Sequence, residues 1–114
     1  MKKLAVVACV LFVATATFAH HGWSEYDTNT PLTLLGEIAE FGYEHPHTFI
    51  RLVTAEKTWL AVLAPPSRMS MRGLGRGSLK AGDRVTLIGH PSRVNAGEMR
   101  ANQIVVDGKT VDFR

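Results

Sequence analysis

The stretch HTFIRLVTAEKTWLAVLAPPSRMSMRGLGRGSL, residues 47–79, decides the fold. It opens with two short runs, residues 47–55 and 58–64, that are rich in the β-branched and aromatic side chains typical of strands. Only Glu56 and Lys57 separate the runs, so the pattern predicts a β-hairpin. Two adjacent prolines at 65–66 suit the first turn of a short helix, and three glycines that follow indicate where it ends.

Strand patterns continue on both sides of this stretch. We expect a long strand over residues 32–44, with Gly36 and Gly42 at bends or bulges, and further strands over 81–91 and 98–108. An Asp-Gly turn leads into a short tail strand at 109–113. Five strands with a helix between the third and fourth predict an all-β, OB-like barrel. The pattern alone also permits a small sandwich or a half-open barrel.

The first nineteen residues have the features of a secretory signal peptide. Lys2 and Lys3 precede an apolar run that is too short to span a bilayer. A cut after Ala19 would expose His20 as the first residue, and a rival cut after Ala16 fits the Ala-x-Ala rule slightly better. We favour the first. The expected organisation is a signal peptide at 1–19 and one barrel domain at 20–114, located in the periplasm or secreted, with no membrane attachment after cleavage.

Removal of this leader changes the overall composition. The formal net charge of the 114-residue chain is +3, but without Lys2 and Lys3 eleven basic residues face ten acidic ones. Such a balance gives no reason to expect a polyanion partner, and we expect no nucleic-acid partner. Cys9, the only cysteine, leaves with the leader, so disulfides and thiolate metal ligands are excluded from the remaining domain.

All five histidines of the chain lie after the leader, and four of them form two close pairs, His20 with His21 and His45 with His47. An N-terminal His20 can chelate a metal through its amine and imidazole, and a second imidazole completes a histidine brace. Tetragonal nitrogen coordination favours copper. We expect His47 to supply that imidazole. If His45 and His47 lie along an extended strand, they point to the same side, so His45 can assist or replace His47.

The neighbouring residues have smaller expected roles. His21 is a supporting or alternative ligand, and Glu25, Tyr26 or Asp27 is placed to supply a weak axial oxygen or to orient an imidazole. His90, before Pro91, is expected in a turn. Met69 and Met71 do not share a helix face, so at least one of them should pack in the core. Taken alone, each histidine pair also fits an ordinary solvated position.

The motifs AHHGWSEYD, LTLLGEI, HPHTFIRL, KTWLAVL, GLGRGSLKAGDRVTLIGHP and ANQIVVDGKTVDF together resemble the exported bacterial proteins of the DUF6152 family. The resemblance covers the whole chain after the leader. It maps the His-His motif of the family onto His20 and His21, and its Pro-His onto Pro46 and His47. His45 stands where the family usually has asparagine. The family brings no established activity.

Three functions remain open at the level of sequence. The first is an exported protein that binds a metal ion, most readily copper, at a histidine brace and handles or delivers it, with another periplasmic protein as a possible recipient. The second is a metal-free OB-like module that binds a ligand or a protein. The third is a copper-dependent oxidative enzyme. The sequence contains no serine-nucleophile motif and no evident catalytic carboxylate pair, so it favours a non-enzymatic role.

Aromatic side chains along the expected second and third strands suggest one further use of the barrel. Such barrels can stack single-stranded nucleic acid on this face. Without a basic groove, however, we expect these aromatic side chains to pack in the core. The residues concerned are Phe41, Tyr43, Phe49 and Trp59.

Overall fold

The computed structural model describes residues 22–114, so the expected signal peptide at 1–19 and the pair His20 and His21 lie outside the described residues. A 3-10 turn, η1 (Trp23–Glu25), precedes the barrel and has no counterpart among the elements expected from the sequence. The remaining elements are β1 (Leu32–Gly42), β2 (Phe49–Val53), β3 (Thr58–Val62), α1 (Pro66–Met71), β4 (Arg84–Pro91), β5 (Glu98–Val106) and β6 (Lys109–Asp112).

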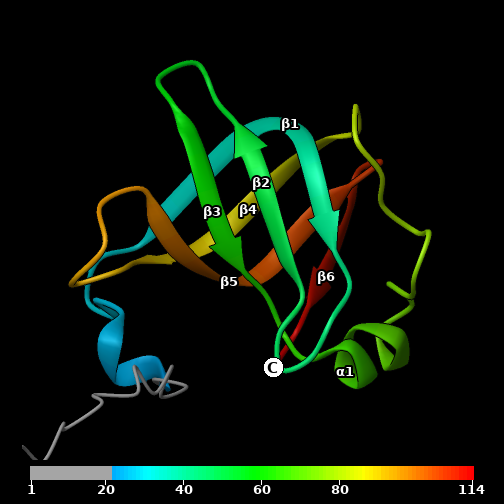
Figure 1. The fold of residues 1–114 in the computed structure, drawn as a ribbon, viewed down its shortest axis with the longest axis horizontal. Coiled ribbons are helices and arrows are strands. Elements are labelled where there is room, and N and C mark those ends of the chain that lie inside the picture. Colours follow the sequence, from blue (N-terminus) through cyan, green and yellow to red (C-terminus); the bar gives the residue numbers. More distant parts are fainter. Residues whose placement is uncertain (1–21) are drawn as a thin grey trace, which may run out of the picture.

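The strands close into the predicted five-stranded barrel (Figure 1). β1 pairs antiparallel with both β2 and β4, β2 pairs with β3, and β4 pairs with β5. A short parallel pairing of β3 with β5 completes the circuit. α1 lies between β3 and β4 in the chain, which confirms the expected OB-like order of elements. β6 continues the sheet beyond β5.

The core is built largely from the alternation of side chains along the strands, which register shifts interrupt in β1 and between β4 and β5. In β1, Leu34 and Ile38 are buried, whereas Leu35 and Glu37 between them are exposed. The same pattern in the other strands gives one contiguous core. Its fully buried members include Ile50, Leu52, Ala61, Leu63, Met69, Leu87, Met99 and Ile104.

α1 ends as its glycines predict. Gly73 has a positive φ of 83°, and the Leu74 N–H donates to the Met69 carbonyl at 2.8 Å. The Gly73 N–H donates to the Ser70 carbonyl at 3.0 Å, which completes a Schellman motif. Met69 is buried and Met71 is 84% exposed, so one of the two methionines packs in the core, as expected.

Two local predictions for the barrel wall were wrong. The bulge in β1 lies between Ile38 and Glu40 rather than at Gly36 or Gly42. Gly36 has a different role, because a Cβ at this position would lie 2.3 Å from the Val53 carbonyl oxygen. The glycine therefore permits close approach of β2. β2 begins at Phe49 and not at His47, so His45 and His47 lie in the loop before the strand.

A candidate ligand and metal site on the barrel face

A cavity of about 530 Å³ opens on the face formed by β2 and β3. The loop between β1 and β2 forms one rim, the loop before β5 forms another, and η1 closes one end. This volume lies within the range of small-ligand sites, and OB barrels commonly use this face for binding. The lining residues are Glu25, Tyr26, Glu44, His45, Pro46, His47, Thr48, Phe49, Arg51, Leu60, Val62, Asn95, Glu98 and Arg100.

The loop between β1 and β2 brings both predicted histidines to the cavity. His45 is exposed, His47 is half-buried, and the ring Nδ1 of His47 is shielded from solvent. The His45–Pro46 peptide bond is cis, and a bend replaces the extended strand that we expected here. The two imidazoles nevertheless line the same cavity. Thr48 fixes the base of the loop, since its N–H and its hydroxyl both donate to the Ala64 carbonyl, at 3.1 Å and 2.8 Å.

Tyr26 and Glu98 form a polar pair in the cavity wall. The Tyr26 hydroxyl donates to the Glu98 carboxylate at 3.0 Å. Burial of the phenol, reinforced by the neighbouring carboxylate, raises the pKa of Tyr26 well above its ordinary value. This phenol therefore stays protonated through the neutral range. Arg100 contacts the same ring, with its guanidinium carbon 6.0 Å from the ring centroid.

Main-chain contacts hold the segment after η1 against the end of β4. The Asp27 N–H donates to the Pro91 carbonyl at 2.9 Å, and the Arg93 N–H donates to the Glu25 carbonyl at 2.8 Å. Tyr26 and Ser92 form an antiparallel bridge. The chain that follows His20 and His21 is thereby fixed beside the cavity from Glu25 onward.

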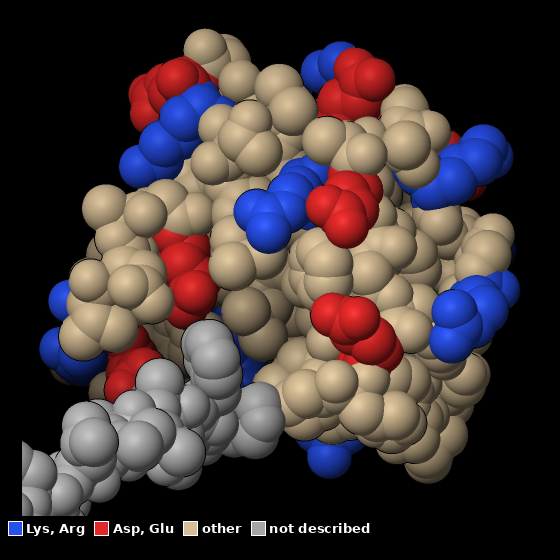
Figure 2. Space-filling view, viewed as in Figure 1, with Lys and Arg blue, Asp and Glu red and all other residues tan. Residues whose placement is uncertain are grey.

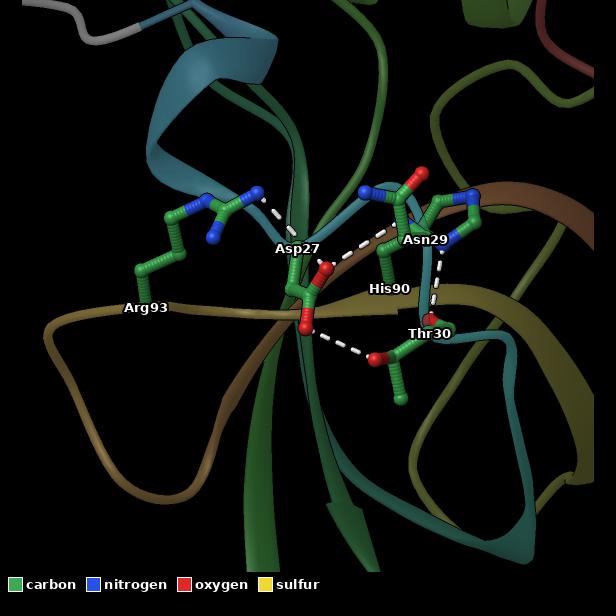
Figure 3. A network of polar contacts seen from close by, with 5 residues as sticks. All are labelled: Asp27, Asn29, Thr30, His90 and Arg93. Carbon is green, nitrogen blue, oxygen red and sulfur yellow. Dashed lines mark hydrogen bonds and ion pairs between the residues drawn. The ribbon is translucent and has the colours of Figure 1, made fainter.

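Three residues were expected to supply an oxygen to the metal site. Glu25 and Tyr26 line the cavity, and Asp27 does not. Figure 3 shows its partners. The Asp27 carboxylate accepts from the Thr30 hydroxyl at 2.7 Å and pairs with Arg93 at 3.6 Å. The Thr30 bond is the main reason that the pKa of Asp27 is lowered. His90 belongs to β4 and not to a turn, and its Nδ1 lies 2.9 Å from the Thr30 carbonyl oxygen.

Trp23 and Arg100 are important to this region, although neither stands out in the sequence. The guanidinium carbon of Arg100 lies 4.6 Å from the Trp23 ring centroid. The Trp23 ring also meets the rings of Tyr26 and His90 edge-on, at 6.2 Å and 5.9 Å. The contacts with Arg100 and His90 join residues more than sixty positions apart, so no local pattern reveals them. In the sequence, the only feature that draws attention to Trp23 is its position with Gly22 directly after the two histidines.

The aromatic side chains of the barrel face are half-buried rather than fully enclosed. Phe41, Tyr43 and Trp59 pack against the core from its edge, and Lys57 lies 4.3 Å from the Trp59 ring centroid. On the face shown in Figure 2, acidic and basic residues are interspersed and form no continuous basic tract.

The described part of the chain contains neither a cluster of three or more metal-ligating side chains nor a membrane-spanning helix. No group of three or more His, Asp or Glu side chains within 22–114 is arranged to hold a metal ion. In this same range, no helix is both long and apolar enough to cross a bilayer.

Comparison with solved structures agrees with the barrel architecture. A crystal structure of TiaS in complex with a tRNA and ATP matches with a TM-score of 0.54, at 16% identity, over 70% of this chain and 18% of TiaS. A ZRD-deleted mutant of TiaS in complex with agmatine matches with a TM-score of 0.54, at 18% identity, over 73% of this chain and 24% of that one. At such low identity the likeness shows the fold alone, and the chain spans about a fifth of the TiaS proteins.

Comparison with protein families is more specific. No curated protein sequence matches the chain. The model of DUF6152, a family of unknown function, matches residues 6–100, which include the two histidine pairs and most of the barrel. The chain therefore belongs to the DUF6152 family.

Proposed function

We propose that the protein is exported and binds a metal ion, most readily copper, at the cavity on the β2–β3 face. His20, freed by removal of the leader, would supply its amine and imidazole, and His47 a second imidazole. His45 and His21 would assist. The observation that carries this proposal is that His45 and His47 share one cavity with Glu25, a residue only five positions after His20.

The length of the intervening chain is compatible with this arrangement. Five residues span at most about 17 Å when fully extended, and Glu25 already lies in the cavity wall. The described residues offer the cavity two imidazoles and no complete metal site, so the amine and imidazole of His20 would supply what is missing. Nitrogen donors of this kind suit Cu(II), which could then be held for storage or transfer. We assign the protein a role in ion handling or delivery rather than in catalysis.

The cavity wall supplies further support. Three carboxylates and two arginines line the cavity with the histidines, so acidic groups outnumber basic ones by one, a balance that favours a cation over an anion. The carboxylates are those of Glu25, Glu44 and Glu98, and the arginines are Arg51 and Arg100. The Glu98 carboxylate is already engaged by the Tyr26 hydroxyl. We expect the hydrogen bond from the Tyr26 hydroxyl to the Glu98 carboxylate to persist when the imidazoles bind the ion.

The first test is the intact mass of the exported protein, which identifies the cleavage site. An N-terminal His20 supports the proposal, whereas Thr17 as first residue contradicts it, because the amine would then be three residues away from His20. The second test is a Cu(II) titration against a competing chelator. We expect affinity to fall at least tenfold in His47→Ala and in a variant with one alanine added before His20.

His90→Ala is the matched control, because this histidine bonds to Thr30 and does not line the cavity. Its copper affinity should equal that of the wild type. If His47→Ala and the extended variant also retain wild-type affinity, the brace is wrong. Nitrogen hyperfine structure in the Cu(II) EPR spectrum should change in the two site variants only.

The size of the cavity supports a second candidate function, a metal-free module that binds a small organic ligand. A cavity of about 530 Å³ with apolar walls from Leu60 and Val62 can accept such a ligand. Retention of a small molecule by the copper-free protein in native mass spectrometry, with loss in Val62→Arg, would favour this function. A copper affinity unaffected by the histidine variants would accompany it.

A further inference from the structure

Arg100 also lines a second, smaller hollow, which has no other lining residue in common with the histidine cavity. The volume of this hollow is about 30 Å³, which is enough to hold a water molecule. Three arginines from different elements reach it: Arg68 from α1, Arg100 from β5 and Arg114 after β6. The remaining lining residues are Trp23, Ala64, Ala101, Asn102 and Phe113, none of which is acidic. We call this site the arginine hollow.

Two of the three guanidinium groups are held in place by neighbours other than carboxylates. The Trp23 ring centroid lies 4.6 Å from the guanidinium carbon of Arg100 and 5.6 Å from that of Arg114. The Asn102 amide, turned so that its nitrogen donates to the Ile88 carbonyl at 2.7 Å, accepts from Nε and Nη2 of Arg114 at 3.2 Å and 3.0 Å. The donors of the hollow are therefore positioned in advance, which lowers the entropic cost of binding an anion.

The positive charge of the hollow is poorly compensated. Within residues 22–114, neither Arg68 nor Arg100 forms an ion pair. Arg100 is half-buried, and burial together with repulsion from Arg68 lowers its pKa. Two acidic side chains lie in the surroundings, together with the main-chain carboxylate of Arg114, which accepts from Arg72. Glu98 accepts from Tyr26, and Asp112 accepts from the Arg114 main-chain N–H and from Gln103, so it offsets part of the charge of Arg114.

We propose that the arginine hollow binds a small tetrahedral oxyanion, phosphate or sulfate, through the guanidinium groups of Arg68, Arg100 and Arg114. Guanidinium forks match the oxygen spacing of such anions and bind them through paired, charge-assisted hydrogen bonds. The side chain of Arg68 extends from a short surface helix and is exposed, so it can move to accommodate an ion larger than water. This site uses neither histidine pair, and it shares only Arg100 with the histidine cavity.

Tryptophan fluorescence provides the assay. The chain has two tryptophans, so Trp59→Phe leaves Trp23, in the wall of the hollow, as the only reporter. Inorganic phosphate, sulfate and chloride are titrated into the metal-free Trp59→Phe protein at constant ionic strength. We expect a saturable change in emission and a rise in melting temperature with phosphate and sulfate, and neither with chloride. No saturable change with either oxyanion overturns the proposal.

Arg68→Gln should weaken phosphate binding at least tenfold without affecting the fold, because its side chain is exposed. The matched control is Arg84→Gln, which removes the same charge from an exposed position in β4 outside the hollow. Its phosphate affinity should stay within twofold of the parent protein. Equal loss in both variants would mean that phosphate responds only to net charge, and the hollow would not be a site. Glycerol phosphate in place of inorganic phosphate shows whether the anion can be carried on a larger molecule; binding of either form supports the site.

Discussion

Replacement of Gly89 by alanine should destabilise the barrel where β4 meets β5. Gly89 is buried opposite Ala101, directly after a register shift in this pair of strands. An added Cβ would lie 1.8 Å from the Arg100 carbonyl oxygen and 2.7 Å from the Arg100 carbonyl carbon. Because the obstacle is main chain, no side-chain rotation can relieve the contact. The strands themselves must separate until the nearest atom is at least 3.0 Å away.

The magnitude follows from what this separation breaks. If the separation breaks two ladder hydrogen bonds between the strands, the cost is about 2 kcal/mol in total, at about 1 kcal/mol each. Measured costs of overpacking a core, about 1–3 kcal/mol, agree with this value. The lower chain entropy of alanine in the unfolded state offsets only about 0.5 kcal/mol. We expect a net loss of about 1.5 kcal/mol, which corresponds to a melting temperature lower by roughly 6–12 °C in a domain of this size.

Urea unfolding followed by circular dichroism measures this loss. The control is Gly75→Ala, whose Cβ would meet only the Ser70 hydroxyl oxygen, at 3.6 Å, and whose φ is not positive. The free energy of unfolding of the control should stay within about 0.5 kcal/mol of the wild type. If the two variants unfold at the same urea concentration with the same slope, the steric argument is refuted.

Two further predictions concern the cavity wall and the core. Because the folded-state pKa of Tyr26 lies above its unfolded value, the phenol contributes stability at neutral pH that is lost as pH rises beyond about 10. Between about pH 9 and about pH 11, the urea midpoint of the wild type should therefore fall further than that of Tyr26→Phe, and parallel curves would contradict this. Leu52→Ala should cost about 2–5 kcal/mol, since Leu52 is fully buried. Leu35→Ala, at a position that is 63% exposed, should change the unfolding free energy by less than about 0.5 kcal/mol.

Local chemistry explains why so much of the barrel could be predicted. The alternation of buried and exposed positions around Leu34 and Ile38 indicates a strand with one buried face, and the structure has it. The Asp107–Gly108 pair predicts a tight turn, and both residues have positive φ, 49° and 77°. The helix end at Gly73 is likewise a property of neighbouring residues. All of these signals act within a few positions along the chain.

The details of the site depend on contacts between distant parts of the chain, which such signals do not contain. The bulge between Ile38 and Glu40 lies directly after Glu37, where the pairing of β1 with β4 ends and its pairing with β2 continues. The bend at His45 and Pro46 depends on how the loop meets the rest of the cavity rim. The stacking of Arg100 on Trp23 joins β5 to η1. The sequence could identify His45 and His47 as candidates, but it could not show that they share a wall with Tyr26 and Glu98.

The junction of β3 and β5 has a consequence for ligand discovery. These strands meet over three residue pairs, Leu60 to Val62 with Glu98 to Arg100, in the parallel pairing that is slightly weaker per residue. We expect this seam to part before the other strand pairs during native-state fluctuations. Leu60 and Glu98 also line the cavity, so a ligand that contacts both strands will stabilise the pairing of β3 with β5. The Leu60 N–H, which donates to the Gly97 carbonyl at 2.9 Å, should then exchange with deuterium more slowly. Slower exchange at this amide would therefore reveal a ligand in a mixture of compounds before its identity is known.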